Sequence, residues 1–120
     1  MATFDRDTLR RLHDAQEIVI RTGKHPDKPV VIWVAVAGDE VFVRSVRGPK
    51  GRWYKDLAAG GPAELDLAGR KVAVQAMPAS DQMAIDQASR EYLRKYQTSP
   101  YAQSMVRADT LSTTLRLEPR

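Results

Sequence analysis

The chain of 120 residues has no cysteine and only two histidines, and these absences remove several classes of protein. Without cysteine there is no disulfide framework, no thiolate zinc site and no cysteine nucleophile, so packing and backbone hydrogen bonds must hold the fold. His13 and His25 stand twelve positions apart, with no partner at helical or turn spacing. The sequence therefore predicts neither a metal site nor a serine–histidine hydrolase.

Long apolar runs are also missing. None approaches the roughly 20 residues needed to span a bilayer, and Met1 to Arg11 is charged throughout, unlike the apolar core of a signal peptide. We expect a cytoplasmic protein without a membrane partner. A chain of this length has room for one domain, residues 1–120, with one ordinary core.

Charge is concentrated in one segment. The net charge is +4, and the 15 acidic residues are interspersed with the 19 basic ones over most of the length. Proteins that bind nucleic acid usually spread Lys and Arg along a face and interleave aromatic residues. The pattern here favours a small phosphorylated ligand and makes nucleic acid an unfavoured partner.

The basic segment is residues 44–57, RSVRGPKGRWYKDL. Between Val41 and Lys55 it has five cations and no carboxylate, together with two glycines and a Trp-Tyr pair. Glycine lets backbone N–H groups approach a phosphate, Arg and Lys supply charge-assisted hydrogen bonds worth about 1.5–3 kcal/mol each, and the aromatic residues offer a flat surface for a ring. The segment lacks the Lys-Ser/Thr ending of a P-loop. It is either an anion site or the solvated end of a hairpin.

Two helices are predicted. Thr3–Gln16 has acidic residues at its start and apolar residues at helical spacing. A longer helix has Ser80 as its N-cap and Asp81 in its first turn, and it stops before Pro100. The apolar stripe of this helix, which we expect to pack against the core, is Ile85, Ala88, Tyr92 and Tyr96.

Strands fill the first half of the chain. Glu17–Thr22 is partly alternating, and the breaker cluster Gly23–Pro29 predicts a loop. The apolar run Val30–Val36 is typical of a strand covered on both sides in a barrel. Glycine in the Gly38-Asp39 turn can take a positive φ, so Glu40–Val46 should return antiparallel.

A second hairpin and a last strand complete the prediction. Ala63–Leu67 and Lys71–Ala76 alternate on either side of Ala68-Gly69-Arg70, and Leu111–Leu117 alternates again. About six strands and two or three helices indicate an α+β fold, a small antiparallel barrel with helices at its flank.

This order of elements resembles the split β-barrel of the pyridoxamine-phosphate-oxidase-like superfamily, nearest its deazaflavin-dependent nitroreductase branch. The likeness covers residues 17–76, with a strand followed by RTGK, an apolar strand ending in a Gly-Asp turn, and VFVRSVRGPKGRWYKDLAAGGPAELDLAGRKVAVQA. The positions of this chain that correspond to the pattern of this branch are Ser45, Gly48, Trp53, Tyr54, Asp56, Leu57, Pro62, Gly69 and Arg70.

Two departures separate the chain from that branch. Asp56 stands where the branch prefers Asn, and a carboxylate beside a phosphate would repel it unless turned away. The loop before the second strand is short, Arg21–Lys24, and is followed by Pro26 and Pro29. The chain therefore fits an uncharacterised bacterial family, in which cofactor binding is altered or lost if these departures reach the site.

The resemblance implies a flavin- or deazaflavin-binding protein, with FMN or deazaflavin as cofactor. Its activity would be that of a small-molecule oxidoreductase, and it would be a homodimer with the cofactor near the subunit contact. The alternative is a non-enzymatic split-barrel module that has lost the cofactor. Arg44 would join the site only if its strand ends or bulges at Ser45. The cofactor-binding residues that the resemblance implies are Lys24, Ser45, Arg47, Lys50, Trp53, Tyr54 and Lys55.

Overall fold

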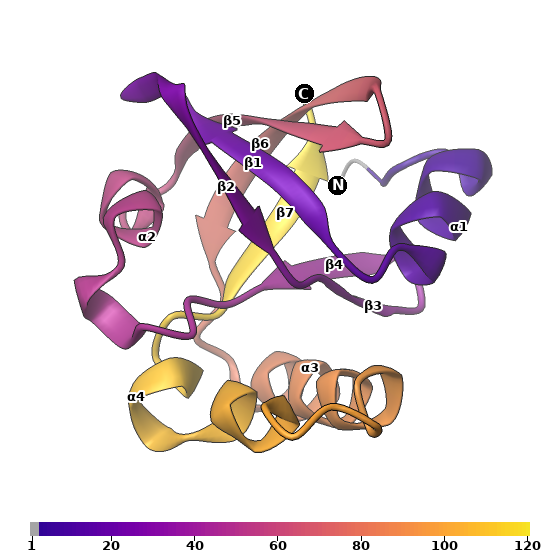
Figure 1. Ribbon diagram of the computed structural model, residues 1–120, viewed down its shortest axis with the longest axis vertical. Coiled ribbons are helices and arrows are strands. Elements are labelled where there is room, and N and C mark those ends of the chain that lie inside the picture. Colours follow the sequence, from indigo (N-terminus) through magenta and orange to yellow (C-terminus); the bar gives the residue numbers. More distant parts are fainter. Residues whose placement is uncertain (1–2) are drawn as a thin grey trace.

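The structure is a computed structural model that describes residues 3–120. Seven antiparallel strands form one strongly curled sheet with helices packed around it (Figure 1). The predicted α+β class is confirmed, with one strand more than expected. The helices are α1 (Arg6–Asp14), α2 (Arg52–Leu57), α3 (Gln82–Lys95) and α4 (Ala108–Leu111), and the short 3-10 turns are η1 (Gly48–Lys50) and η2 (Ala102–Val106). The strands are β1 (Ile18–Thr22), β2 (His25–Ile32), β3 (Ala35–Ala37), β4 (Glu40–Val43), β5 (Gly61–Leu67), β6 (Arg70–Pro78) and β7 (Leu115–Pro119).

The strand order β2-β1-β5-β6-β7-β4-β3 explains the curl of the sheet. β2 and β3 follow one another in the chain with only Trp33 and Val34 between them, yet they are the two opposite edges of the sheet. The sheet must therefore bend round until its edges approach each other. This bend gives the half-barrel shape in Figure 1, with α3 packed beside β3.

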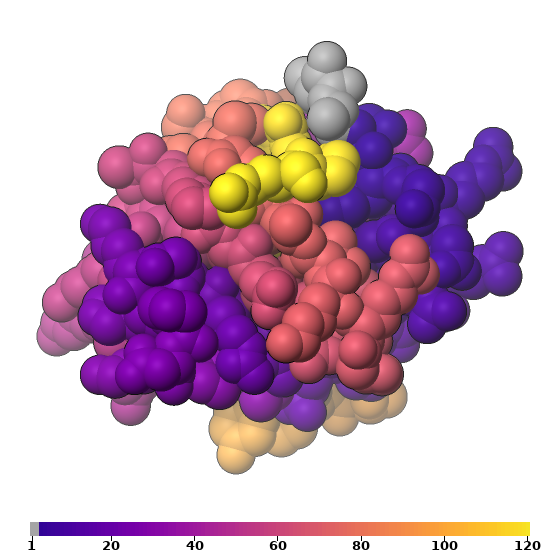
Figure 2. Space-filling model, turned by 90° about the horizontal axis from the view of Figure 1, so that it is seen from above, coloured from indigo at the N-terminus to yellow at the C-terminus, as the bar shows by residue number. Residues whose placement is uncertain are grey.

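Alternating residues of the strands fill the inside of the barrel. Ile18 and Ile20 on β1 and Leu65 on β5 are buried, and the intervening residues are more exposed, as the alternation predicts. The pairing of β6 with β7 continues to Arg120, whose N–H donates to the Ala73 carbonyl at 3.1 Å. Figure 2 shows the C-terminal residues, in yellow, at the surface on this side of the molecule.

A second apolar cluster docks α3 onto the sheet. Tyr92 and Tyr96 are both buried, which confirms that they pack against the core. The Tyr96 hydroxyl donates to the Gln16 carbonyl at 2.7 Å, and its ring stacks on Trp33 with 3.9 Å between centroids and 3° between planes. Burial raises the pKa of Tyr96 to about 12. These tyrosines are therefore neutral, hydrogen-bonded parts of the core.

The apolar run at residues 30–36 is not one strand. β2 ends at Ile32 and β3 begins at Ala35, and the two lie on opposite edges of the sheet. The predicted loop at residues 23–29 is also wrong in part, because β2 begins at His25 and includes Pro26 and Pro29. An edge strand accepts proline, since the missing N–H need not face a neighbour.

Several predicted boundaries shift. β4 stops at Val43, three residues earlier than expected, and β7 begins only at Leu115. The N-cap of α3 is Asp81 and not Ser80, because the Asp81 carboxylate accepts the Ala84 N–H at 3.2 Å. The turn at Gly38 has the positive φ that was expected, 61°.

Among residues 3–120, none of the helices combines the length and the apolar character needed to cross a bilayer.

Candidate functional site

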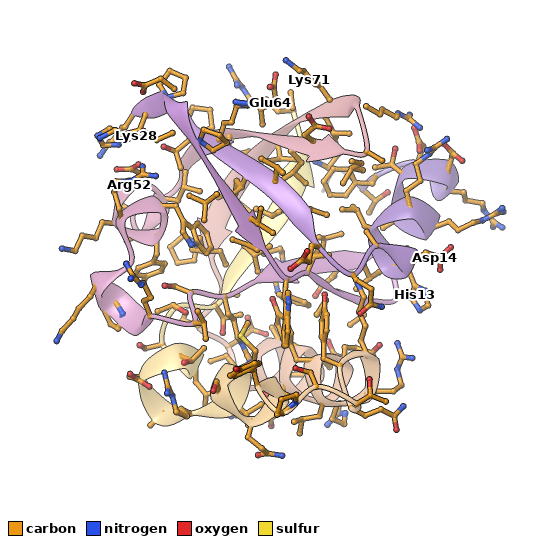
Figure 3. The ribbon with its side chains drawn as sticks, viewed as in Figure 1. His13, Asp14, Lys28, Arg52, Glu64 and Lys71 are labelled. Carbon is orange, nitrogen blue, oxygen red and sulfur yellow. The ribbon has the colours of Figure 1, made fainter. Side chains whose placement is uncertain are left out.

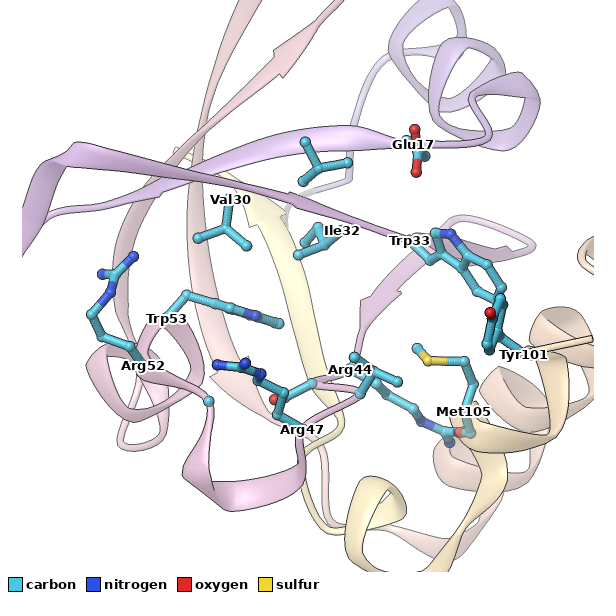
Figure 4. Close-up of a pocket in the computed structure, with 14 residues that line it drawn as sticks. Glu17, Val30, Ile32, Trp33, Arg44, Arg47, Arg52, Trp53, Tyr101 and Met105 are labelled. Carbon is cyan, nitrogen blue, oxygen red and sulfur yellow. The ribbon is translucent and has the colours of Figure 1, made fainter.

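A cleft of about 670 Å³ opens where the last residues of β2, the segment after β4 and the chain around η2 approach one another (Figure 4). Ligand pockets are commonly of this size and are lined by apolar and aromatic side chains with a few polar groups. This cleft has two different ends. Arg47, Arg52 and Trp53 lie at one end, which we call the cationic end, and Trp33 and Tyr101 lie at the other, the aromatic end.

Ser45 lies at the cationic end because β4 ends at Val43 and the chain turns there. The residue is 1% exposed, and its backbone N–H donates to Thr113 Oγ1 at 2.9 Å. Its own hydroxyl makes no hydrogen bond within residues 3–120. A Cβ placed on Gly51 would come within 2.4 Å of Ser45 Oγ, so glycine is required for the close approach of the two segments.

The guanidinium of Arg47 is available to contact a ligand. Its side chain forms no hydrogen bond or ion pair with any residue that the structure describes, and it lines the cleft. Arg52, at the start of α2, is partly engaged. It donates to the Lys28 carbonyl at 3.1 Å and lies 3.4 Å from Asp56 Oδ2, and Figure 3 shows Arg52 directly below Lys28. The end thus holds two guanidinium groups and an unpaired hydroxyl.

Asp56 is turned away from the cleft, so its carboxylate does not face a phosphate there as its sequence position suggested it could. Its carboxylate accepts the Thr22 hydroxyl at 2.7 Å and lies 2.7 Å from His25 Nδ1. Burial by itself would raise the pKa of Asp56, but the hydrogen bonds from His25 and Thr22 and the charge of Arg52 hold it below its ordinary value. The carboxylate therefore ties α2 to the β1–β2 turn and is not among the residues that line the cleft.

Arg44 forms part of the cleft wall, but its charge is used elsewhere. The strand does end before Ser45, yet the Arg44 side chain runs behind the wall and is 1% exposed. Its guanidinium carries four hydrogen bonds, to Thr114 Oγ1 (2.9 Å), Ser89 Oγ (3.0 Å), Met105 O (2.9 Å) and Ile85 O (2.8 Å). Burial lowers the pKa of Arg44 from its ordinary value. This arginine is a structural cation that fixes η2 against α3.

The structure brings together only some of the residues that the sequence pointed to. Ser45, Arg47 and Trp53 line the cleft. Lys24, Lys50 and Lys55 are exposed outside its lining, and the Tyr54 hydroxyl donates to the Ser112 carbonyl at 3.4 Å instead.

Sequence reasoning missed both Arg52 and the aromatic end of the cleft. Arg52 belongs to the basic segment, but only the short helix α2 shows that it faces the cleft. Trp33 is hidden in an apolar run, and Tyr101 comes more than forty residues after the end of the basic segment. No spacing in the sequence connects these residues.

A family model matches residues 8–117, and its description is "Uncharacterized protein conserved in bacteria (DUF2255)". The chain belongs to this family. The match covers most of the chain and confirms the expected uncharacterised bacterial family. Among curated proteins, no significant match is found.

Solved structures show the same fold. Conserved hypothetical protein Rv2991 from Mycobacterium tuberculosis aligns with a TM-score of 0.61 and 10% identity over 99% of this chain and 81% of its own. Campylobacter jejuni ChuZ aligns with a TM-score of 0.66 and 7% identity over 96% of this chain, which spans about half (52%) of ChuZ. The FAD and heme binding protein from Mycobacterium smegmatis aligns with a TM-score of 0.50 and 18% identity, over 97% of this chain and 65% of its own. At these identities the similarity concerns the fold.

Proposed function

We propose that this protein binds a phosphate-bearing, flavin-type cofactor in the cleft and is a small-molecule oxidoreductase. The observation that carries the proposal is the cationic end, where Ser45, Arg47, Arg52 and Trp53 line the cleft. The Asp56 carboxylate lies 3.4 Å from Arg52 but outside this lining, and its shorter contacts are to Thr22 and His25. Such convergence of cations, a hydroxyl and a ring surface suits a phosphate attached to a heterocycle.

The residues present fit the cofactor group. Arg47 and Arg52 would hold the phosphate by charge-assisted hydrogen bonds, and the Ser45 hydroxyl would complete its coordination. Gly51 lets Ser45 lie close to the start of α2, since a Cβ on Gly51 would come within 2.4 Å of Ser45 Oγ. Trp53 would form the wall against which the ring lies. When bound, the cofactor would supply the hydride or electron transfer, and the protein would place the ring and limit the access of water.

The fold similarity supports a cofactor of this kind without naming it. One structural neighbour is, by its title, an FAD and heme binding protein. The resemblance of residues 17–76 to the deazaflavin-dependent nitroreductase branch favours FMN or a phosphorylated deazaflavin, since both carry a phosphate at the end of a side chain attached to a flavin-type ring. We propose one of these two as the cofactor.

We also propose that the protein is a homodimer, as the same resemblance implies. Two apolar side chains at the rim of the cleft support this, because Val31 is 58% exposed and Val46 is 50% exposed. Apolar residues gathered at a rim are typical of a surface that a partner covers. A second copy packed there would shield the cofactor from water.

A titration with FMN and with deazaflavin tests the proposal. Quenching of cofactor fluorescence is followed for the wild type, for Arg47→Ala and for Lys55→Ala, which removes one positive charge from the same segment but outside the cleft. We expect Arg47→Ala to weaken binding about tenfold or more, as for the loss of a charge-assisted bond, and Lys55→Ala to change it by less than about threefold.

Equal binding by the wild type and Arg47→Ala would contradict the assigned phosphate contact. Failure of the wild type to bind either cofactor would favour the alternative, a non-enzymatic split-barrel module.

A further inference from the structure

We propose that the aromatic end of the cleft is a second ligand site, which binds a planar aromatic molecule of neutral or positive charge. Trp33, Tyr101, Met105 and Glu17 meet there, at the opposite end from Arg47 and Trp53 (Figure 4). The inference rests on the proposed function only for its role, since the second ligand would be the substrate lying next to the cofactor.

Trp33 provides a fixed platform. One face of its indole stacks on Tyr96, with centroids 3.9 Å apart, and the ring lines the cleft while remaining half-buried. Tyr96 is itself held by its hydrogen bond to the Gln16 carbonyl. A platform whose position is set before binding loses little conformational entropy when a ring packs on it.

Tyr101 and Met105 complete an apolar enclosure. Tyr101 is 68% exposed although it is a large aromatic residue, and it lies next to Trp33 in Figure 4. Met105 is buried, and its carbonyl accepts a hydrogen bond from the Arg44 guanidinium at 2.9 Å. Thioether and aromatic groups together favour a flat apolar ligand, and a ligand here would cover the exposed Tyr101 ring.

Charge decides which aromatic molecules fit. Glu17 is the acidic residue among those that line the cleft, and it lies above Trp33, away from Arg47 and Arg52. Arg44 keeps its positive charge near this end, but it is buried and its hydrogen bonds go to four protein oxygen atoms, so Glu17 is the exposed charged side chain here. Lys95 does not line the cleft, and its ammonium donates to the carbonyls of Leu12 and Val34 at 3.0 Å. Direct contact with Glu17 would favour a cationic over an anionic ligand at this end, whereas Arg47 and Arg52 favour an anion at the other.

The two tryptophans allow each end to be observed separately, because Trp33 and Trp53 are the only ones in the chain. Their indole N–H signals in a ¹⁵N-labelled sample are assigned with Trp33→Phe and Trp53→Phe. The protein is then titrated with FMN and with two naphthyl probes, 2-naphthylmethylamine and 2-naphthylacetate. The two probes share a ring but carry opposite charges. We expect the amine to shift the Trp33 signal, the acetate to bind about threefold or more weakly there, and FMN to shift Trp53.

Variants identify the contacts. Tyr101→Ala should weaken binding of the amine about threefold to tenfold, as for the loss of an aromatic pair, and leave the affinity for FMN unchanged. Glu17→Gln should reduce the preference for the amine over the acetate. Met83→Ala removes an exposed apolar side chain on α3 away from the cleft and controls for non-specific binding. It should change neither the affinity for the amine nor the affinity for FMN.

The inference is overturned if neither naphthyl probe shifts Trp33, if Tyr101→Ala and Met83→Ala bind the amine equally, or if the amine and FMN displace each other. A titration in which FMN shifts Trp53 but the amine leaves Trp33 unmoved contradicts the second site alone. A titration in which the amine shifts Trp33, while neither FMN nor deazaflavin shifts either signal, contradicts the proposed function and leaves the second site standing.

Discussion

Close contact between Gly51 and Ser45 shapes the cationic end of the cleft. The backbone of Gly51 has an ordinary φ of −60°, so glycine is needed for space and not for conformational freedom. The composition of the basic segment left open an anion site or a solvated hairpin end, and the structure places Ser45, Arg47 and Trp53 in the lining of one cleft. The turned carboxylate of Asp56 could not be predicted, because its partners Thr22 and His25 are more than thirty residues away along the chain.

Gly51→Ala tests this contact. The added Cβ would lie 2.4 Å from Ser45 Oγ, and we expect the free energy of unfolding in urea to fall by about 1–3 kcal/mol. In the double variant Gly51→Ala/Ser45→Ala the clashing oxygen is gone, so most of the lost stability should return. Additive losses in the double variant would show that the close contact is not the cause.

Arg44 is the second residue whose role depends on tertiary structure. It belongs to the basic segment by sequence, yet it bonds to oxygen atoms contributed by α3, η2 and the chain before β7. We expect Arg44→Lys to lower the free energy of unfolding by about 3 kcal/mol, because an ammonium group cannot reach these separated oxygen atoms together. Arg47→Lys, on the exposed arginine of the same segment, should change stability by less than about 0.5 kcal/mol in the same urea titration. Equal effects of the two substitutions would contradict the structural role of Arg44.

At the scale of elements, α2 is the unit that places two site residues. Arg52 and Trp53 stand on this short helix, and Asp56, one turn later, holds it to the β1–β2 turn. The strands and long helices were largely predictable because their alternation and spacing follow burial. A six-residue helix in a glycine-rich connection was not, since so short a helix depends on tertiary contacts.

The pH dependence of stability reports on this attachment. Because the pKa of Asp56 is lowered in the folded state, its ionised form stabilises the fold above the ordinary value of 3.8, and this contribution is lost as the pH falls through the folded-state value. We expect Asp56→Asn to be about 1–2 kcal/mol less stable than the wild type at pH 7 and the difference to shrink in strong acid. Urea unfolding at several pH values measures it. A difference that stays constant with pH would contradict the ionised attachment.

At the scale of the molecule, the connection from β2 to β3 closes the sheet. The sequence predicted that the apolar run at residues 30–36 belongs to the barrel core. It could not predict that the run is divided between two edges of the sheet, because periodicity does not show where a continuous apolar run leaves one strand and enters another. This closure also creates the cleft, since the last residues of β2 form one wall and the segment after β4 forms the other.

The proposed homodimer is tested at this scale by sedimentation equilibrium. The wild type should have twice the mass of one chain, and Val31→Lys and Val46→Lys should shift it toward the monomer because each places a charge in the apolar contact. Met83→Lys changes a similarly exposed apolar residue on α3 and should leave the mass unchanged. A wild-type monomer, or dimers equally weakened by all three substitutions, would contradict this contact.

The most direct test of the central claim compares FMN with riboflavin, which has the same ring but no phosphate. Calorimetric titration of the wild type should show FMN binding about tenfold or more tightly than riboflavin, and Arg47→Ala should remove most of that difference while leaving riboflavin affinity unchanged. Equal affinities of FMN and riboflavin for the wild type would contradict a phosphate site formed by Ser45, Arg47 and Arg52.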